Sequence, residues 1–342
     1  GQAVAGIWVD RFGAHRVLFA GVGLLTLSGA LVAIAPGFPG LMAAAFVAGC
    51  GNSVFHPADF AVINRRVSAH RLGHAFSVHG LSGNLGWALA PVVMVGVAST
   101  AGWRTAGWVA AGFGALALSL LVWQRERLQY ELAHVHADGK PVLKVAFADI
   151  LKAPLVWISF AFFFFATFGF GALQNFAPSL LRDLYGLSLA TATSALSTYL
   201  VGGACGLLAG GFLAKPGARF EGTVSAAFGA SALIALALAG LPIPAWLVLP
   251  AMAAMGFLAG IAGPSRDLLV RTATKSRLGE GAFGRVYGMV YSGLDVGLAV
   301  APIAFGLLLD HQMLRAVFVG FALSFLGAIV AAQLLAREAE AR

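Results

Sequence analysis

Long apolar segments alternate with short polar connections along the whole chain. Ten of these segments are long enough for a helix to cross a hydrocarbon core of about 30 Å. We predict membrane-spanning helices near residues 17–35, 40–63, 72–98, 103–123, 154–177, 190–213, 222–241, 245–270, 285–309 and 314–335. A shorter apolar lead-in occupies residues 1–9. The pattern predicts an all-α polytopic transmembrane helical bundle of about ten complete spans and a stub.

The composition excludes an ordinary soluble fold. Apolar residues make up 59% of the chain and charged residues 11%, whereas soluble domains contain about 45–50% and about 25% of these classes. A soluble fold could not bury this much apolar surface, so most of it must face lipid or other membrane helices.

The basic residues are distributed unevenly between the two sides of the predicted bundle. Of the 22 lysines and arginines, only Arg104, Arg182 and Arg315 fall on one side. Cytoplasmic connections carry the excess of basic residues, so the other side and the C-terminus are predicted to be cytoplasmic. The net charge of +8 then reflects membrane topology and not nucleic-acid binding. We expect an integral multi-pass protein of a bacterial inner (plasma) membrane.

The longest polar connection divides the predicted spans into two groups. We predict an N-terminal helical bundle over residues 1–123, a cytoplasmic central loop over 124–152 and a C-terminal six-helix bundle over 153–342. Compared with six spans in the second group, the first is short of one span and most of another. We therefore expect a six-plus-six helix protein whose first one and a half helices are not in this sequence.

Two polar segments inside apolar runs partly repeat one another. Residues 51–59 contain a histidine, a proline and an acid, and residues 263–267 contain a proline, an arginine and an acid. The matching residues further along are Asn84, Gly86 and Pro91 in the first copy and Asp295, Gly297 and Pro302 in the second. Such a duplication, with charge in both copies, predicts two pseudo-symmetric half-bundles around a shared polar site.

The first copy places three polar side chains on one helix face. At about 100° per residue, Asn52, His56 and Asp59 fall within about 60° of one another on an unbroken helix. His79 on the next span is predicted at a similar depth, so the two imidazoles could share a proton or a ligand. The alternatives are a neutral His56 bonded to a carbonyl that Pro57 opens, and a salt bridge from Asp59 to an arginine of the first cytoplasmic loop.

The second copy offers an acid and a base. Asp295 lies near the middle of its span with Tyr287 and Tyr291 on the same face, and its burial would favour the protonated form, which makes it a candidate carrier of protons or cations. A structural hydrogen bond to another helix is the alternative. Arg266 could receive an anionic substrate, or it could extend to the cytoplasmic surface. The remaining candidates for the substrate and proton pathway are Asn84, Gln174 and Asn175.

The segment from Gly6 to Arg16 carries a recognisable motif on the predicted cytoplasmic side. It reads Gly6, three residues, Asp10-Arg11, one residue, Gly13 and then Arg16. The glycines allow close approach and a tight turn, Asp10 could lie at a neighbouring helix N-terminus, and the arginines could pair with acids. The motif resembles the signature between the second and third helices of the major facilitator superfamily. The resemblance implies a gate that acts in alternating access, and the alternative is an ordinary charged loop.

The resemblance covers most of the chain but has departures. The corresponding loop of the second half has Lys215 where the signature has an acid, and Ala45 and Ala48 replace the Arg and Gln of a family motif on the fourth helix. The superfamily places its helices three, six, nine and twelve on the outside, which agrees with four spans almost without polar residues: 17–35, 103–123, 222–241 and 314–335. The run Phe55-His56-Pro57, followed by an acid and by Gly83 to Gly86, is similar to the fosmidomycin-resistance branch.

These features predict a secondary active transporter that moves a small organic solute or drug by alternating access, with proton-coupled export as the expected mode. An importer of a small organic anion is the alternative within the family, and a membrane-embedded enzyme, a channel or a receptor are alternatives of other classes.

Neither a phosphate-binding Gly-x4-Gly-Lys-Ser/Thr loop nor a His-Glu-x-x-His motif occurs in the sequence. The spacing His134-x-His136 fits a solvated loop better than a metal site. We expect no enzymatic activity, no cofactor or metal and no nucleic-acid partner, and a monomer whose partners are substrate, protons and lipid.

Overall fold

The computed structural model describes residues 1–128, 147–215, 217–279 and 283–340. Regular secondary structure in these ranges is helical throughout, with one 3₁₀-helix at Ala69–Arg71 and α-helices elsewhere. The prediction of an all-α fold is confirmed. Most of the predicted central loop, including His134 and His136, lies outside the described residues.

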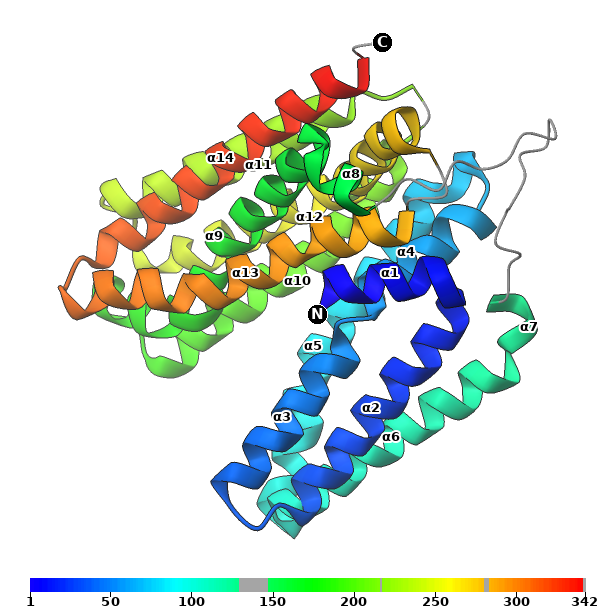
Figure 1. Ribbon diagram of the computed structural model, residues 1–342. Helices are drawn as coiled ribbons and strands as arrows, with labels where there is room; N and C mark the ends of the chain where they lie inside the picture. Colours follow the sequence, from blue (N-terminus) through cyan, green and yellow to red (C-terminus); the bar gives the residue numbers. More distant parts are fainter. Residues whose placement is uncertain (129–146, 216, 280–282, 341–342) are drawn as a thin grey trace. The chain divides into compact units, whose positions relative to one another are not determined.

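The first part of the chain folds into helices that follow the predicted spans (Figure 1). These are α1 (Gln2–Phe12), α2 (Ala14–Ile34), α3 (Phe38–Asn52), α4 (Phe55–Arg66), α5 (Leu72–Ala101) and α6 (Trp103–Trp123). The short α7 (Arg125–Leu128) and α8 (Phe147–Lys152) form the two ends of the predicted central loop. α1 corresponds to the predicted stub, and the 30 residues of α5 reach about 45 Å at about 1.5 Å per residue.

Each remaining predicted span also corresponds to one helix. These are α9 (Pro154–Tyr185), α10 (Leu189–Leu213), α11 (Phe220–Gly240), α12 (Ala245–Leu278), α13 (Phe283–Asp310) and α14 (Leu314–Glu340). α9 and α12 continue beyond the predicted ends at residues 177 and 270, because a helix does not stop where the apolar run stops. Nine stretches of the described residues have the length and hydropathy of a membrane span, with α3 and α4 counted together.

The predicted helix over residues 40–63 is interrupted. α3 ends at Asn52 and α4 begins at Phe55, just before Pro57. Proline has no N–H to donate, and its ring clashes with the carbonyl four residues earlier, which here belongs to Ser53. The prediction of one continuous helix, and of a single polar stripe along it, is therefore wrong. The counterpart in the second copy behaves differently, because α12 runs through Pro264.

The chain forms two compact units. Unit 1 contains residues 1–66, 86–152 and 278–291, and unit 2 contains residues 67–85, 153–277 and 292–342. α5 and α13 each contribute to both units, because each helix crosses a boundary between them. The units do not follow the predicted division at residues 124–152, which stays a prediction.

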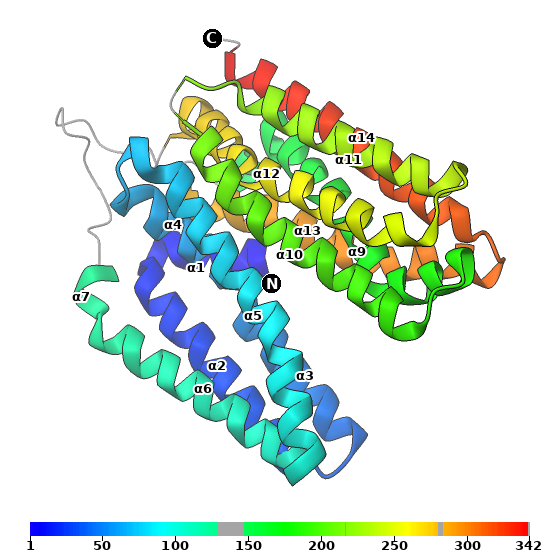
Figure 2. The ribbon, with the colours of Figure 1, turned by 180° about the vertical axis from the view of Figure 1, so that it is seen from behind.

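Helix packing in unit 1 depends on small residues. α2 and α6 lie side by side (Figures 1 and 2). A Cβ atom at Gly29 of α2 would lie 2.7 Å from the backbone nitrogen of Ala111, and one at Gly107 of α6 would lie 2.8 Å from that of Ala33. Backbones therefore approach directly, as is typical of helices that associate within a membrane.

Unit 2 combines an aromatic core with close glycine contacts. The ring centroids of Phe228 on α11 and Phe325 on α14 lie 4.2 Å apart, and those of Phe321 and Phe325 lie 4.3 Å apart. On α10, a Cβ atom at Gly206 would collide with the carbonyl oxygen of Phe257 on α12. α9, α11 and α14 thus share a packed interior, while α10 and α12 meet backbone to backbone.

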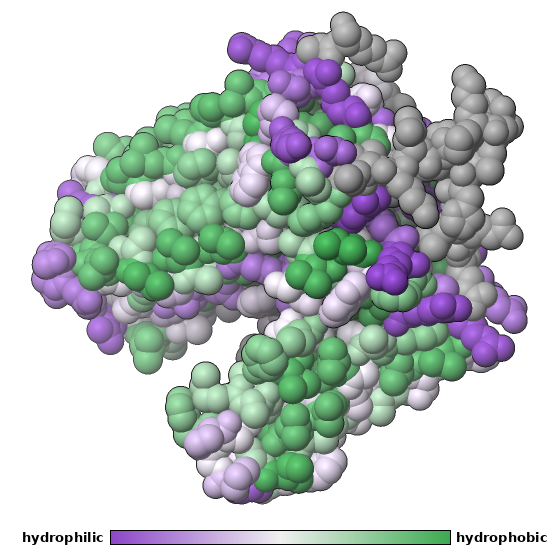
Figure 3. Space-filling view, viewed as in Figure 1, coloured by the Kyte–Doolittle hydropathy of each residue, from purple (hydrophilic) through white to green (hydrophobic). Residues whose placement is uncertain are grey.

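The surface has the distribution expected for a membrane protein. Figure 3 shows hydrophobic residues along the lengths of the helices and hydrophilic residues gathered near helix ends. Large apolar side chains are exposed on this surface, among them Leu233, which is 68% exposed, and Val330, which is 59% exposed. In water such a surface would aggregate, whereas in a bilayer it contacts lipid.

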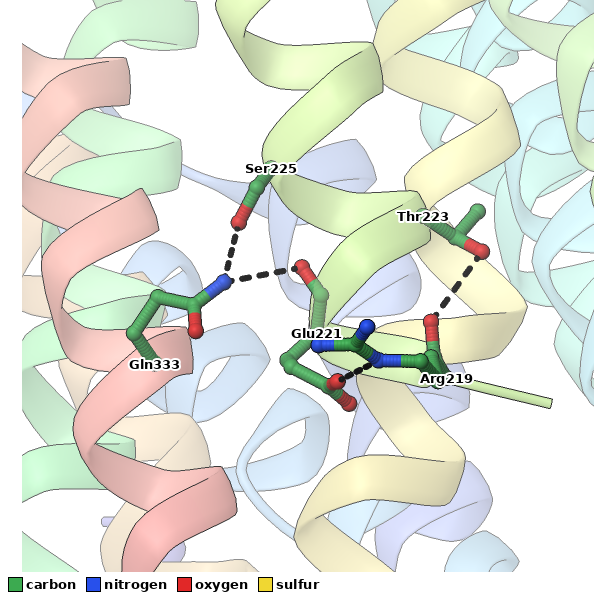
Figure 4. A network of polar contacts seen from close by, with 5 residues as sticks. All are labelled: Arg219, Glu221, Thr223, Ser225 and Gln333. Carbon is green, nitrogen blue, oxygen red and sulfur yellow. Dashed lines mark hydrogen bonds and ion pairs between the residues drawn. The ribbon is translucent and has the colours of Figure 1, made fainter. Parts of the chain in front are cut away.

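A polar network joins α11 and α14 at the end of unit 2 that carries basic residues. Gln333 of α14 donates hydrogen bonds to Ser225 Oγ at 2.8 Å and to the carbonyl oxygen of Glu221 at 3.5 Å (Figure 4). Arg219 pairs with the Glu221 carboxylate at 3.1 Å. Glu338, which follows Gln333 on α14, pairs with Arg277 of α12 at 3.3 Å. These exposed contacts fix helix ends, and we assign them a structural role.

Candidate functional site

Asp10 of α1 binds the N-terminus of α13. Its Oδ1 accepts a hydrogen bond from the backbone N–H of Gly284 at 3.1 Å. Its Oδ2 accepts from the backbone N–H of Arg285 at 3.1 Å and from Arg285 Nε at 2.7 Å. The carboxylate therefore satisfies helix N–H groups that have no partner within α13 and also forms an ion pair.

The surroundings of Asp10 act on its charge in opposite directions. Burial raises the pKa of Asp10 above its usual value of 3.8, and Arg285 opposes this rise through its hydrogen bonds and positive charge. The side chains of Asp10 and Arg285 are 10% and 14% exposed. A helix N-terminus carries partial positive charge, so it favours the ionised carboxylate as well. Asp10 is thus a mostly buried charge that depends on α13 for compensation.

The glycines of the motif permit this contact. A Cβ atom at Gly6 would collide with the carbonyl oxygen of Gly284 and lie 2.9 Å from Arg285 Cα. Gly13 has φ 86° and ψ 144°, a conformation that favours glycine, and it lies between α1 and α2. α1 and the first turn of α13 therefore meet with almost no side chain between them.

The two arginines of the motif were predicted to pair with acids, but both are exposed. Arg11 is exposed, with its Cζ 5.2 Å from the centroid of the Phe12 ring. Arg16 is exposed on α2. Within the described ranges neither forms an ion pair with an acid, and the base that pairs with the motif's own acid is Arg285. The sequence did not reveal Arg285, because it lies far along the chain in a loop rich in basic residues.

His56 takes part in an aromatic cluster between α4 and the start of α13. We define this aromatic cluster as His56, Phe60, Tyr287 and Tyr291. His56 stacks on Tyr291 with ring centroids 4.5 Å apart, and Phe60 lies 4.8 Å from Tyr291 and 5.1 Å from Tyr287. Asn64 donates to Tyr287 Oη at 3.3 Å. Like the Asp10 contact, the cluster joins the first part of the sequence to α13 within unit 1.

The predicted polar stripe is divided by the helix break. Asn52 is exposed at the end of α3, whereas His56 and Asp59 are half-buried on α4. His79 lies on the part of α5 that belongs to unit 2. The sharing of a proton or ligand between His56 and His79 stays a prediction.

In unit 2, the first turns of α5 pack against α10. Ser77 donates a hydrogen bond to the carbonyl oxygen of Leu207 at 2.8 Å. A Cβ atom at Gly73 would collide with the carbonyl oxygen of Ala214. The Leu207 side chain lies between Gly80 of α5 and Gly263 of α12, since Cβ atoms at these glycines would come within 3.3 Å and 2.7 Å of its Cδ2.

Arg266 is half-buried on α12 and forms an ion pair, and both alternatives for its role stay predictions. Its Nε and Nη2 lie 2.9 Å and 3.3 Å from the two carboxylate oxygens of Asp267, and its Cζ lies 4.8 Å from the centroid of the Phe163 ring on α9. Asp267 also interacts electrostatically with His79 of α5. Asp267 was not among our candidates, although an Arg-Asp dipeptide inside an apolar run was a signal that could have identified it.

The remaining candidates lie on α5, α9 and α13. Asp295 is exposed on α13, so the prediction that it is buried is wrong, and it does not share the buried surroundings of Tyr287 and Tyr291. Gln174 is half-buried, and Asn175 is exposed and donates to the carbonyl oxygen of Gly171 at 2.8 Å. Asn84 is also half-buried, on the part of α5 in unit 2.

Unit 1 also contains an apolar groove of about 840 Å³ between α1, α2 and α3. Trp8, Phe12 and Phe46 line it together with small residues, and Arg16 borders it. None of the predicted pathway residues lines this groove. Among the described residues, no cluster of three or more His, Cys, Asp or Glu side chains could hold a metal ion.

Comparisons with known proteins give consistent matches. A family model described as Major Facilitator Superfamily matches residues 1–283. The fosmidomycin resistance protein of Escherichia coli (strain K12) is 27% identical over 215 residues, which are 61% of this chain and 51% of that protein. A multidrug resistance protein B homolog of Mycobacterium tuberculosis (strain ATCC 25618 / H37Rv) is 32% identical over 125 residues, 36% of this chain and 23% of that protein. The matched part of the chain thus spans about half the length of the first relative and under a quarter of the second.

Solved structures of transporters share the fold. The proton:xylose symporter XylE aligns with 98% of this chain and 82% of its own, with a TM-score of 0.78 and 14% identity. The human organic anion transporter MFSD10 aligns with 97% and 80%, with a TM-score of 0.74 and 16% identity. At such identities the likeness concerns the fold alone. The match of the family model and the helices of membrane-spanning length support an integral multi-pass membrane protein. The chain belongs to the major facilitator superfamily.

Proposed function

We propose that this protein is a proton-coupled secondary transporter that exports a small organic solute or drug by alternating access. The observation that carries the proposal is the Asp10 contact, in which the motif of the first part of the chain holds the N-terminus of α13. A contact of this kind between two helices that are far apart in the sequence can be made and broken as a unit. The names of the two resistance-protein relatives support export.

Two contacts would have to break for the cytoplasmic side to open. One is α1 with α13, through Asp10 and Gly6, and the other is α5 with α10, through Ser77 and Gly73. Both join helices from different halves of the sequence, and both lie near the ends where basic residues gather. The first contact is held by charge, whereas the second is held by a neutral hydrogen bond and close backbone packing. We propose that these contacts form the cytoplasmic gate.

Protons could supply the energy for export. A proton that crosses a potential of about 100 mV releases about 2.3 kcal/mol, whereas pumping a solute against a tenfold gradient costs about 1.4 kcal/mol. Asp295, exposed along α13, and the half-buried Asp59 on α4 are acids within the spans that could carry the proton. We assign the coupling proton to Asp295, because this acid lies near the middle of its span, where an ionisable group is a functional candidate.

Import of a small organic anion is the second candidate function. Arg266 favours it, because this cation lies inside a spanning helix and is held in a bidentate ion pair. In either mode we place the protein in the inner membrane with a cytoplasmic C-terminus, as a monomer. The direction of transport separates the two candidates.

Transport in reconstituted vesicles tests the proposal. A solute is first identified by expressing the protein in an efflux-deficient bacterial host and measuring tolerance to a panel of toxic compounds. Purified protein in proteoliposomes should then move this solute with proton counterflow, and Asp295→Asn should abolish that proton flux. Asp310→Asn, at the exposed end of the same helix, is the matched control and should leave the flux unchanged.

Each outcome has a defined meaning. Solute movement by the wild type without any proton flux would overturn proton coupling. Full proton flux in Asp295→Asn would overturn the assignment of the proton to Asp295. Movement of solute and proton in the same direction would replace export by the anion-import candidate.

A further inference from the structure

Arg266 and Asp267 form an ion pair between neighbouring residues of α12. Nε of Arg266 lies 2.9 Å from Oδ1 of Asp267, and Nη2 lies 3.3 Å from Oδ2. Two nitrogens of the guanidinium therefore each contact one oxygen of the carboxylate. The side chains are 23% and 7% exposed. An ion pair inside a spanning segment is costly to maintain, so it marks a functional candidate.

The Phe163 ring of α9 holds the guanidinium in one orientation. Cζ of Arg266 lies 4.8 Å from the ring centroid, within the range of a cation–π contact. An arginine fixed in this way presents a rigid planar fork, which matches a carboxylate through two parallel hydrogen bonds. The Asp267 carboxylate occupies that fork in the structure, and it shows which chemical group the fork fits.

Two buried hydroxyl groups lie on the same two helices. Ser265 adjoins Arg266 on α12, and Ser159 precedes Phe163 by one turn on α9, so Ser159 and Phe163 share a helix face. Both serine side chains are fully buried, and their Oγ atoms have no hydrogen-bond partner among the described residues. Buried hydroxyls without partners are unusual, and here they lie on the two helices that carry Arg266 and Phe163.

We propose that Arg266 is the binding site for a small organic carboxylate and that Asp267 occupies this site when no substrate is bound. The carboxylate of the substrate replaces that of Asp267 on the guanidinium, and Ser265 and Ser159 donate hydrogen bonds to the bound group. The displaced Asp267 retains a polar neighbour, because it interacts electrostatically with His79 of α5. This assignment rests on the proposed transport function and names its substrate class.

Competition between Asp267 and the ligand separates this proposal from a static ion pair. If Asp267 competes for the site, removal of its charge should strengthen anion binding. If the pair only fixes α12, removal of either partner should lower stability and leave anion binding unchanged. The chain offers a matched control in Arg182 and Asp183 of α9, which form a similar neighbouring pair at 2.9 Å but are 53% and 42% exposed.

Thermal unfolding in detergent provides the assay, with sodium benzoate as the probe and intrinsic tryptophan fluorescence as the signal. Sodium chloride at the same sodium concentration and choline chloride are the salt controls. A ligand that binds the folded state raises Tm with its concentration. Benzoate should raise the Tm of the wild type. Asp267→Asn should show the same rise in Tm at a benzoate concentration about 10- to 100-fold lower, as expected when a charged competitor is removed.

Further variants keep the result interpretable. Arg266→Gln should abolish the response to benzoate, Arg266→Lys should weaken it because lysine lacks the planar fork, and Arg182→Gln should respond like the wild type. Each variant is first shown to unfold cooperatively without ligand. An equal response in Arg266→Gln and the wild type, or an equal response to choline, would overturn the site.

Transport measurements separate this inference from the proposed function. If the protein moves a neutral or cationic solute and Arg266→Gln moves it equally well, the carboxylate site is wrong while the transport function stands. If the wild type binds benzoate through Arg266 but transports no solute of the panel, the transport function fails and the binding site stands.

Discussion

Removal of the charge on Asp10 should open unit 1 at the end where α1 meets the N-terminus of α13. In Asp10→Asn, the ion pair with Arg285 is lost, and an amide replaces a carboxylate that accepts hydrogen bonds from two backbone N–H groups of α13. Breaking a buried ion pair costs about 3–5 kcal/mol, and losing a hydrogen bond to a charged group costs about 1.5–3 kcal/mol. Because the two side chains retain 10% and 14% exposure, we expect Asp10→Asn to destabilise the closed form by about 2–4 kcal/mol. This corresponds to an increase of about 30- to 900-fold in the ratio of open to closed forms.

Alkylation of a buried thiol reports this opening. Val286 of α13 is fully buried and close to cysteine in size, so Val286→Cys places a protected thiol beside the Asp10 contact. The native Cys50 and Cys205 are exposed and are first replaced by serine. When opening and closing are fast relative to alkylation, the alkylation rate follows the population of the open form, so Asp10→Asn should increase this rate by the same large factor.

Controls define the result that would refute this reasoning. Asp183→Asn removes an acid from an exposed pair with Arg182, which is worth little, and it should leave the rate unchanged. Arg285→Gln should act like Asp10→Asn, and the double variant should not add the two effects because both remove the same contact. An Asp10→Asn rate within twofold of the control would show that the Asp10 contact does not hold the gate closed.

Three other contacts give testable expectations. Gly6→Ala should open the same gate in the alkylation assay because its methyl group collides with Gly284, whereas Gly23→Ala, which has open space around its Cβ, should not. Tyr291→Ala should lower the free energy of unfolding in detergent by about 3–5 kcal/mol because a fully buried aromatic side chain is removed, and a loss below about 1 kcal/mol would contradict the packing of the aromatic cluster. Ser77→Ala should cost about 0.5–1.5 kcal/mol through its lost hydrogen bond to α10, against no measurable change for the exposed Ser99→Ala.

The sequence predicted the helices well because each span has to satisfy its own backbone hydrogen bonds and be apolar over a fixed length. Both signals are local, so a window of about twenty residues contains them. The Pro57 break was also within reach of local reasoning, since the clash with the preceding turn depends only on nearby residues. We overlooked it because the apolar run continues through the break.

Charged side chains were harder to place. The position of Asp295 along its helix suggested burial, but its exposure depends on which neighbouring helices cover that face of α13. Arg266 was recognised as a cation inside a span, yet its contact with Phe163 requires knowing that α9 packs beside α12. Candidate residues can thus be found by residue type and depth, whereas their partners come from packing.

The sequence by itself determined the membrane class, the spans, the side that carries basic residues and the superfamily motif, because these follow from composition and spacing along one chain. Only the tertiary structure decided that Asp10 meets the N-terminus of α13, that His56 stacks on Tyr291 and that the Phe163 ring lies against Arg266. The physical reason is that charges and rings act over a few ångströms in space. Which groups come that close is set by helix packing between residues hundreds of positions apart, and no local pattern records it.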